Sequence, residues 1–361
     1  MILYKNRKGC LIGWPFLLVI FQSHWKHPVA FLLPLIVSND TISMKPPYTL
    51  TGTILQQISL ISEKIGEINA THLQRPKAEL RKSNRIKTIQ SSLEIEGNTL
   101  TVEQVTAILE NKRVIAPQKD ILEVKNAIAA YDAIKSFKSF SFSAFLSAHK
   151  ILMNGLIATA GKLRTGNVGI VKGSKLTHLA PPGGMVKPLI KDLFLYIKKD
   201  TEPILIKSCV FHYELEFIHP FTDGNGRMGR LWQTVLLMQQ YPVFEFLPIE
   251  SIIKKKQKEY YNVLSQSDKA GQCTVFIEFM LQVLAEALEE LLDSRPSSLS
   301  SIDRLLLFKS QIGTQLFSRQ DYLRTFKNIS PATASRDLKE AVDKKLLKKS
   351  GDKRMTVYIF R

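Results

Sequence analysis

Residues 219–230 read His219-Pro-Phe-Thr-Asp-Gly-Asn-Gly-Arg-Met-Gly-Arg230, between two stretches with helical patterns. Gly224-Asn225-Gly226 is a short loop of residues that tolerate a positive φ angle. The segment 231–240 that follows is apolar and periodic, which predicts a helix. Backbone N–H groups of such a loop, at the N-terminus of a helix, bind anions. The sequence therefore predicts a phosphate-binding turn.

The charged residues around this turn add chemistry to it. Arg227 and Arg230 are three residues apart, so they share one helix face and can both reach a bound polyphosphate. Asp223 immediately precedes the loop, and Mg²⁺ prefers one or two carboxylates together with phosphate oxygens. His219 can accept the proton of an attacking hydroxyl near neutral pH. Each feature alone is common in loops and on solvated helix faces, but their combination within twelve residues indicates a catalytic phosphate site.

The same stretch resembles the Fic motif, HPFx(D/E)GNGRxxR, at every specified position. The resemblance implies that AMP passes from ATP to a Tyr, Thr or Ser hydroxyl of a protein, and that pyrophosphate leaves. His219 would deprotonate the hydroxyl, Asp223 would bind Mg²⁺, and Phe221 would anchor the loop in the core. The implied phosphate contacts are Gly224, Asn225, Gly226 and Arg227 for the α- and β-phosphates and Arg230 for the γ-phosphate.

A second resemblance lies upstream, where Ser92-Leu-Glu-Ile-Glu96-Gly97 matches the inhibitory motif of the family, (S/T)xxxE(G/N). The resemblance implies that Glu96 pairs with Arg230, occupies the γ-phosphate position and misorients ATP. Locally, Glu96 falls on the last turn of a helix expected over residues 76–96, where a lone glutamate is ordinarily solvated. Because the motif precedes the core, the chain is similar to the N-terminally self-inhibited class, which needs no separate antitoxin.

Residues 161–187 interrupt the helical pattern. Two short apolar runs, 168–171 and 176–180, precede Pro181-Pro-Gly-Gly184, which predicts a β-hairpin closed by a Pro/Gly loop, with helices resuming at about Pro188. The hairpin resembles the Fic flap, which pairs with an extended segment of the target protein, as in strand addition to a sheet edge. The alternative is an ordinary surface hairpin. Tyr260 and Tyr261 resemble a tyrosine pair near the adenine pocket of relatives; the alternative is a pair of core aromatic residues.

The expected fold is mainly α, a Fic-type helical bundle with a β-hairpin flap, followed by a winged-helix module. Isoleucines at spacings of three and four from Ile54 to Ile68 predict the first helix. Thr101-Val-Glu-Gln104 is a capping box that begins a later one, and residues 143–157 predict another. The expected segments are a hydrophobic leader (1–43), an N-terminal helical region with the inhibitory helix (44–115), the catalytic core (116–295) and a winged-helix-like domain (302–361).

The leader contains apolar runs at 10–21 and 29–37, both shorter than the roughly 20 residues that cross a bilayer as a helix. No stable membrane span is therefore expected. Lys5, Arg7 and Lys8 give the leader the charge pattern of a signal peptide, but it has no clear cleavage site. Our interpretation is that translation begins at Met44; a membrane anchor or export signal is the alternative. The three cysteines show no paired spacing, which favours a reducing, cytoplasmic location.

The C-terminal segment is basic, with 14 Lys/Arg and six Asp/Glu over residues 302–361 and hence a net charge of +8 out of +18 for the whole chain. Ser330 and Pro331 are typical of a helix start, and an alternating strand pattern ends the chain. This order resembles a winged helix. DNA could bind through residues 318–355, with bases near Ser335 and Arg336 and phosphates on Lys349, Lys353 and Arg354. The alternative is a protein-docking module.

The favoured function is thus an ATP- and Mg²⁺-dependent protein AMP-transferase that Glu96 holds inactive by pairing with Arg230. Two other enzymes stay open: one that removes AMP and one that uses another nucleotide donor. A rival of a different class is a DNA-binding regulator that uses the Fic core as a nucleotide sensor. His219 argues against the sensor, because sensing alone needs no base. The sequence does not predict the target protein or the oligomeric state.

Overall fold

The computed structural model describes residues 46–71, 75–172, 175–294, 300–327, 329–352 and 355–361, and four short strands near the start of the chain. These strands pair as two antiparallel hairpins, β1 (Phe16–Val19) with β2 (Phe31–Pro34) and β3 (Ile36–Ser38) with β4 (Thr41–Ser43). The start site proposed at Met44 and the basic cluster before the first apolar run lie outside the described residues. The chain divides into two compact units, Met1–Leu292 and Asp293–Arg361.

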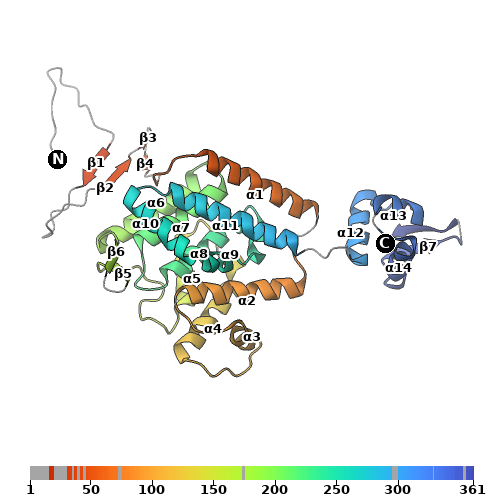
Figure 1. Cartoon of the computed structure of the whole chain (residues 1–361), viewed down its shortest axis with the longest axis horizontal. Coiled ribbons are helices and arrows are strands. Elements are labelled where there is room, and N and C mark those ends of the chain that lie inside the picture. Colours follow the sequence, from red (N-terminus) through yellow and green to blue (C-terminus); the bar gives the residue numbers. More distant parts are fainter. Residues whose placement is uncertain are drawn as a thin grey trace, which may run out of the picture. The chain divides into compact units, whose positions relative to one another are not determined.

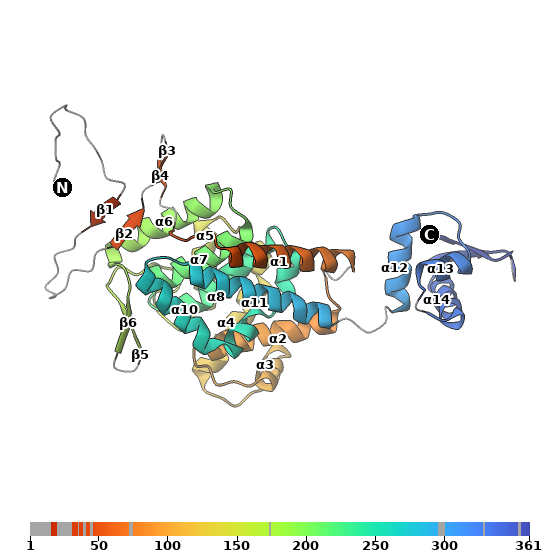
Figure 2. The same cartoon turned by 45° about the horizontal axis from the view of Figure 1, so that its top comes forward.

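The first unit is a bundle of helices in which α7 and α8 lie in the middle (Figures 1 and 2). Both are buried along most of their lengths, so the turn that joins them is held by the core. The helices of this unit are α1 (Gly52–Ala70), α2 (Ala78–Ile95), α3 (Val102–Leu109), α4 (Gln118–Asp132), α5 (Phe142–Leu152), α6 (Gly183–Lys199), α7 (Ile204–Ile218), α8 (Asn225–Met238), α9 (Ile249–Lys255), α10 (Gln257–Ala270) and α11 (Thr274–Asp293), with 3-10 turns at Ile134–Ser136 and Pro242–Phe246.

Local signals in the sequence account for several of these helices. Ile54, Ile61, Ile65 and Ile68 of α1 are buried, which confirms the predicted apolar face. The Thr101 side chain accepts from the N–H of Gln104, whose side chain accepts from the N–H of Thr101. This is the predicted capping box, and it begins α3 directly after the turn that ends α2.

Aromatic side chains fix the centre of the bundle. Phe145 of α5 packs edge-to-face on Phe211 of α7 and on Trp232 of α8, with ring centroids 6.1 Å and 5.2 Å apart. Phe221, in the turn between α7 and α8, is fully buried against Phe145 and stacks on the His149 ring at 3.6 Å. Burial of rings of this size contributes strongly to stability, so Phe221 fixes the α7–α8 turn to the core.

The expected hairpin consists of β5 (Gly169–Lys172) and β6 (Lys175–Leu179), which pair antiparallel and extend away from the helices in Figure 2. The boundary expected after it was wrong. Helix α6 begins at Gly183, five residues before Pro188, so the two glycines belong to its first turn. Gly183 is required in this first turn by a close approach of the backbone rather than by a loop conformation, because a Cβ on Gly183 would lie 1.9 Å from the Thr165 carbonyl oxygen. Helix α5 also ends earlier than expected, at Leu152.

The second unit contains α12 (Ser301–Ile312), α13 (Arg319–Thr325), α14 (Pro331–Asp343), β7 (Leu347–Ser350) and β8 (Val357–Phe360). The two strands are antiparallel, and Phe317 forms a further bridge to Tyr358. Arg304 and Asp337 form a buried ion pair, to which Tyr322 adds a hydrogen bond. Ser330 caps α14, with Pro331 in the first turn, as predicted. Lys353 and Arg354 lie outside the described residues.

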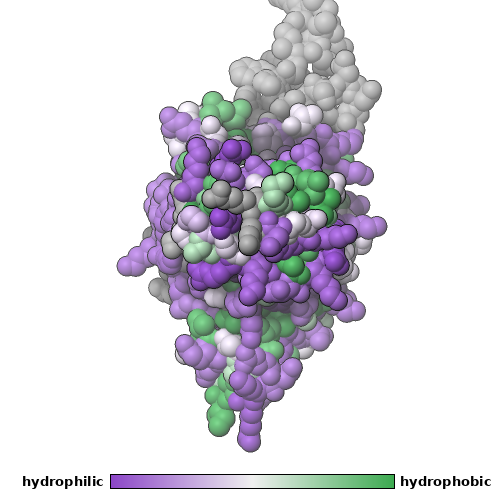
Figure 3. All heavy atoms as spheres, turned by 90° about the vertical axis from the view of Figure 1, so that its right-hand side faces the viewer, coloured by the Kyte–Doolittle hydropathy of each residue, from purple (hydrophilic) through white to green (hydrophobic). Residues whose placement is uncertain are grey.

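On the face that Figure 3 shows, hydrophilic side chains predominate and hydrophobic ones occur in small groups. Among the described residues, no helix combines the length and the apolar character that a membrane crossing requires. Cys209 and Cys273 are buried free thiols.

Candidate functional site

The turn between α7 and α8 carries most of the site. His219 follows the last residue of α7 and adopts a left-handed conformation, with φ 49° and ψ 61°, while its N–H donates to the Leu215 carbonyl. A residue with a Cβ adopts this conformation at a cost of about 1 kcal/mol or more, so surrounding contacts must hold it. The Asn225 side chain closes the turn, because its amide accepts from the Phe221 N–H at 2.9 Å and donates to the Phe221 carbonyl at 3.0 Å.

Helix α8 begins at Asn225, and Gly224 caps it with a left-handed φ of 82°. The first N–H groups of a helix have no acceptor within the helix, and the helix dipole adds positive potential there. Asp223 stands beside this end, and its Oδ1 accepts from the Gly224 N–H at 2.6 Å and from Arg227 Nη2 at 3.1 Å. The side chain of Asp223 is 51% exposed. The start of α8 is therefore a place for an anion, with one accessible carboxylate at its edge.

Arg227 is buried between two carboxylates. Besides Asp223, it contacts Glu123 of α4, whose Oε1 lies 3.2 Å from Nη1. Glu123 also accepts from Nδ2 of Asn98, the residue after Gly97, at 2.8 Å. Asn98 therefore links the turn after α2, through Glu123, to the first arginine of the motif.

Arg230 is buried against the end of α2. Its Nε donates to Ser92 Oγ at 3.1 Å, and its Nη2 donates to the Ser92 carbonyl at 2.9 Å and to Glu96 Oε1 at 2.8 Å. Burial opposes the charge of Arg230, but its neighbours, with the Glu96 carboxylate foremost, together outweigh burial and raise the pKa of Arg230. Ser92 in the last turn of α2 and Glu96 at its C-cap lie one turn apart, so both face the guanidinium.

Gly226 explains how the Glu96 carboxylate fits over α8. A Cβ at this position would lie 2.4 Å from Glu96 Oε1 and 3.1 Å from Arg230 Nη1. Only a residue without a side chain leaves room for the carboxylate there. Glu96 therefore sits against the first turn of α8, beside the N–H groups that could receive phosphate oxygens.

His149 of α5 holds the other side of the turn, and the sequence analysis missed it. The Gly161 N–H donates to His149 Nδ1 at 2.8 Å, so the proton is on Nε2, which donates to the Asp223 carbonyl at 3.0 Å. Burial lowers the pKa of His149 to about 4, so the ring stays neutral near pH 7. A lone histidine on a helix gives no sequence signal for such a role.

Arg164 is a second residue that the sequence analysis missed. Its guanidinium donates to the carbonyl oxygens of Ile218 and His219, at the end of α7. A single arginine in a loop carries no pattern, and the carbonyls that it contacts lie more than 50 residues away along the chain. No sequence signal could have indicated this contact.

The structure separates the two tyrosines of the proposed adenine pair. Tyr260 is 1% exposed, and its hydroxyl contacts His212 Nε2 at 3.1 Å. This placement favours a core role for Tyr260. Tyr261 is 38% exposed, and it is the member of the pair that offers surface to a ligand.

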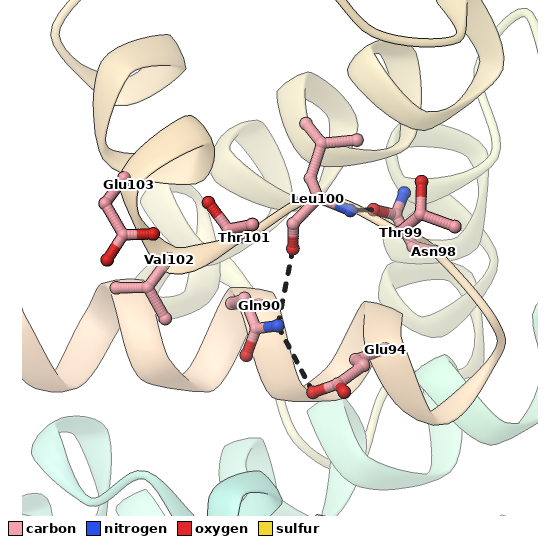
Figure 4. Close-up of a pocket in the computed structure, with 8 residues that line it drawn as sticks. All are labelled: Gln90, Glu94, Asn98, Thr99, Leu100, Thr101, Val102 and Glu103. Carbon is pink, nitrogen blue, oxygen red and sulfur yellow. Dashed lines mark hydrogen bonds between the residues drawn. The ribbon is translucent and has the colours of Figure 1, made fainter.

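A hollow of about 380 Å³ lies on another side of α2, between its last turns and the start of α3 (Figure 4). Gln90 lines it and donates to Glu94 and to the Leu100 carbonyl. Gln90 and Glu94 are offset by two residues from Ser92 and Glu96, which places the two pairs on different faces of the helix. The hollow is thus separate from the Arg230 site.

The described residues contain no group of three His, Cys, Asp or Glu side chains that could hold a metal ion. Asp223 nevertheless suits Mg²⁺ bound to a nucleotide, because that ion takes one or two carboxylates and completes its shell with phosphate oxygens and water. The accessible carboxylate at the start of α8 is consistent with such a ligand.

Comparisons with known proteins agree on one family. The sequence model of the Fic/DOC family matches residues 139–237. The crystal structure of a Fic family protein from Desulfovibrio desulfuricans G20 is 38% identical, with a TM-score of 0.68, and the match covers 88% of this chain and 98% of that one. A fragment of Fic-1 from C. elegans, 22% identical over 67% of this chain and 71% of that one, has a TM-score of 0.54 and supports the fold alone.

Two curated relatives carry the name protein adenylyltransferase. The Caenorhabditis briggsae protein is 31% identical over 53% of this chain and 38% of its own length. The Nematostella vectensis protein is 30% identical over 57% of this chain and 48% of its own length. The chain therefore spans less than half the length of these curated relatives. With the extensive match to the Desulfovibrio protein, these findings show that the chain belongs to the Fic family.

Proposed function

We propose that this protein transfers AMP from ATP to a hydroxyl side chain of another protein. The observation that carries the proposal is the α7–α8 turn, which presents His219 six residues before Asn225, the first residue of the anion-binding start of α8. The names of the curated relatives support the same reaction. Position and charge, rather than a reactive cofactor, account for most of the catalysis in such transfers.

In the proposed step, the hydroxyl oxygen of the target attacks the α-phosphorus of ATP. The imidazole of His219 accepts the hydroxyl proton as the new O–P bond forms. The bond between the α-phosphorus and its bridging oxygen breaks, and pyrophosphate leaves with the electron pair. Backbone N–H groups from Gly224 to Gly226, together with Arg227, would hold the α- and β-phosphates at the start of α8.

Mg²⁺ bound by Asp223 would neutralise charge on the phosphates. Asp223 is positioned for this because Oδ1 is fixed by the Gly224 N–H while the side chain stays accessible. The His149 hydrogen bond to the Asp223 carbonyl holds the same residue from the opposite side.

Glu96 would keep the enzyme at rest. Its carboxylate engages Arg230, the arginine proposed for the γ-phosphate, and lies against Gly226 of α8. A γ-phosphate in the same place would meet a like charge and would lose its cation. ATP could then bind only in an orientation that does not suit transfer.

The target protein would dock on the hairpin of residues 161–187, because the edge of a strand pair offers backbone groups to an extended segment. The C-terminal unit has helices, a bridge and an antiparallel strand pair in the order found in a winged helix. DNA binding through residues 318–355 stays a proposal, to be tested by the salt dependence of binding to duplex DNA.

Two radiolabels test the reaction. The Glu96→Gly variant is incubated with a lysate and Mg²⁺, using ATP labelled either at the α- or at the γ-phosphate. AMP transfer predicts protein-bound label from α-labelled ATP alone. Label from γ-labelled ATP would indicate a kinase. ATP binding without either label would favour another nucleotide donor, AMP removal or the nucleotide sensor.

A further inference from the structure

Arg164 lies beside the α7–α8 turn, between the end of α7 and the base of the β5–β6 hairpin. The residue is 4% exposed, although it carries a guanidinium that is always charged. All of its acceptors in the part of the chain that the structure describes are backbone carbonyl oxygens. A buried cation is costly unless its donors are satisfied, so this arrangement needs an explanation.

The first set of contacts is with the end of α7. Arg164 Nε donates to the His219 carbonyl at 2.6 Å, and Nη2 donates to the Ile218 carbonyl at 3.0 Å. The backbone N–H of Arg164 donates to the Pro220 carbonyl at 2.9 Å. The last carbonyls of a helix lack partners within it and carry partial negative charge, which a cation stabilises. Arg164 thus holds three consecutive peptide groups around His219.

The second set of contacts is with both ends of the hairpin. Nη1 donates to the Gly166 carbonyl at 2.6 Å, before β5, and Nη2 donates to the Pro181 carbonyl at 2.7 Å, after β6. The two ends also meet directly, because the Gly183 N–H donates to Asn167 Oδ1 at 3.0 Å. One planar guanidinium therefore joins the hairpin base to the His219 turn.

We propose that Arg164 is a positioning residue that fixes the backbone of His219 against the hairpin proposed to hold the target. This inference rests on the proposed function of His219. The left-handed conformation of His219 needs support from its surroundings, and Arg164 supplies it. Arg164 would thereby hold a target hydroxyl docked on the hairpin at a fixed distance from His219, the proposed base. A shift of about 1 Å between reacting groups can slow a reaction about a hundredfold.

Arg164→Lys is the informative substitution. Lysine keeps the positive charge, but its compact ammonium group cannot donate in one plane to four carbonyl oxygens as a guanidinium does. Arg304→Lys is the matched control, because Arg304 is also buried but belongs to the other compact unit. Both are made in the Glu96→Gly background, and AMP transfer is measured as kcat and as KM for ATP.

The proposal predicts that Arg164→Lys lowers kcat by about tenfold to a hundredfold while KM for ATP changes by less than about threefold. ATP affinity is spared because Arg164 contacts the α7 end of the turn rather than the start of α8. Arg304→Lys should change neither value. An unchanged kcat in Arg164→Lys, or an equal loss in Arg304→Lys, would overturn the proposal.

A second measurement does not depend on activity. The ring signals of His219 are identified in an NMR spectrum by their loss in His219→Ala. They should shift in Arg164→Lys and stay in place in Arg304→Lys; unshifted signals in Arg164→Lys would overturn the positioning role. If the Glu96→Gly parent transfers no AMP, the proposed function fails, and the NMR result alone decides the role of Arg164.

Discussion

Glu96 Oε1 lies 2.8 Å from Arg230 Nη2, so the residue that caps the end of α2 places a carboxylate on the second arginine of the α8 motif. The guanidinium is almost completely buried, and the Glu96 side chain is about one-third exposed. Removing one partner from a buried ion pair leaves an uncompensated charge. Arg230 is therefore ready to accept another anion when Glu96 is absent, and a phosphate is the candidate.

Glu96→Gly should strengthen the binding of ATP by about tenfold, which corresponds to about 1.4 kcal/mol, and should change ADP binding much less. The reason is that Glu96 is proposed to occupy the position of the γ-phosphate, which ADP lacks. Isothermal titration with each nucleotide and Mg²⁺ measures the difference. Glu94→Gly is the control, because Glu94 lies two residues away on the same helix and pairs with Lys254 instead. Equal gains for ATP and ADP would refute the γ-phosphate assignment.

Gly226→Ala should destabilise the wild-type protein by about 1–3 kcal/mol, because the new Cβ would overlap the Glu96 carboxylate. In the Glu96→Gly background the same substitution should cost less, since only the contact with Arg230 stays close. Urea unfolding of the wild type, the two single variants and the double variant gives the coupling energy between the two substitutions. Gly66→Ala is the control, with no atom within 4 Å of the added group. Additive effects of the two substitutions would contradict the packing described here.

The stability of the protein should fall as the pH drops from about 6.5 to about 4, partly through His149. Burial lowers the pKa of His149 to about 4 in the folded protein, whereas in the unfolded chain it titrates near 6.5. The unfolded state therefore binds more protons in this window, so stability is lost there. His149→Asn should flatten the decline by roughly 1–3 kcal/mol, even if it lowers stability at pH 7.

Urea unfolding at several pH values measures this slope. His212 has its pKa lowered by burial to about 3, and its contribution has the same sign. His212 is present in both the wild type and His149→Asn, so the difference between the slopes of these two proteins isolates the contribution of His149. Parallel slopes would show that His149 does not titrate as described.

Asp223→Asn should reduce AMP transfer by about a hundredfold in Mg²⁺, measured in the Glu96→Gly background. Asparagine can still accept from the Gly224 N–H through Oδ1, so the turn keeps its main contact. Asp223→Glu restores a carboxylate and should recover part of the activity. Full activity of Asp223→Asn would exclude Asp223 as the metal ligand.

Local signals in the sequence were sufficient to predict the end of α2 and the start of α3, beside the site. Thr101 and Gln104 form the expected capping box, and α2 ends at Ile95, with Glu96 as its cap before Gly97. The motif resemblance also anticipated the Glu96–Arg230 contact, across 134 residues. These features depend on residue types at fixed spacings, which a sequence displays directly.

The remaining contacts could not be predicted, because they join side chains to distant backbone groups. Arg164 and His149 both bind carbonyl oxygens of the α7–α8 turn, and every residue type offers a carbonyl. The start of α6 was misplaced for a related reason. Gly183 is needed for its approach to Thr165 rather than for a loop conformation, and that approach exists only in the folded chain.

The role of His219 as the base is tested by comparing protein-bound label from α-labelled ATP in Glu96→Gly and in Glu96→Gly/His219→Ala. Both variants should bind ATP, because His219 belongs to the end of α7 and not to the start of α8. We expect strong labelling in the first variant and a loss of at least about a hundredfold in the second. Equal labelling of the two proteins would contradict the role of His219 as the base.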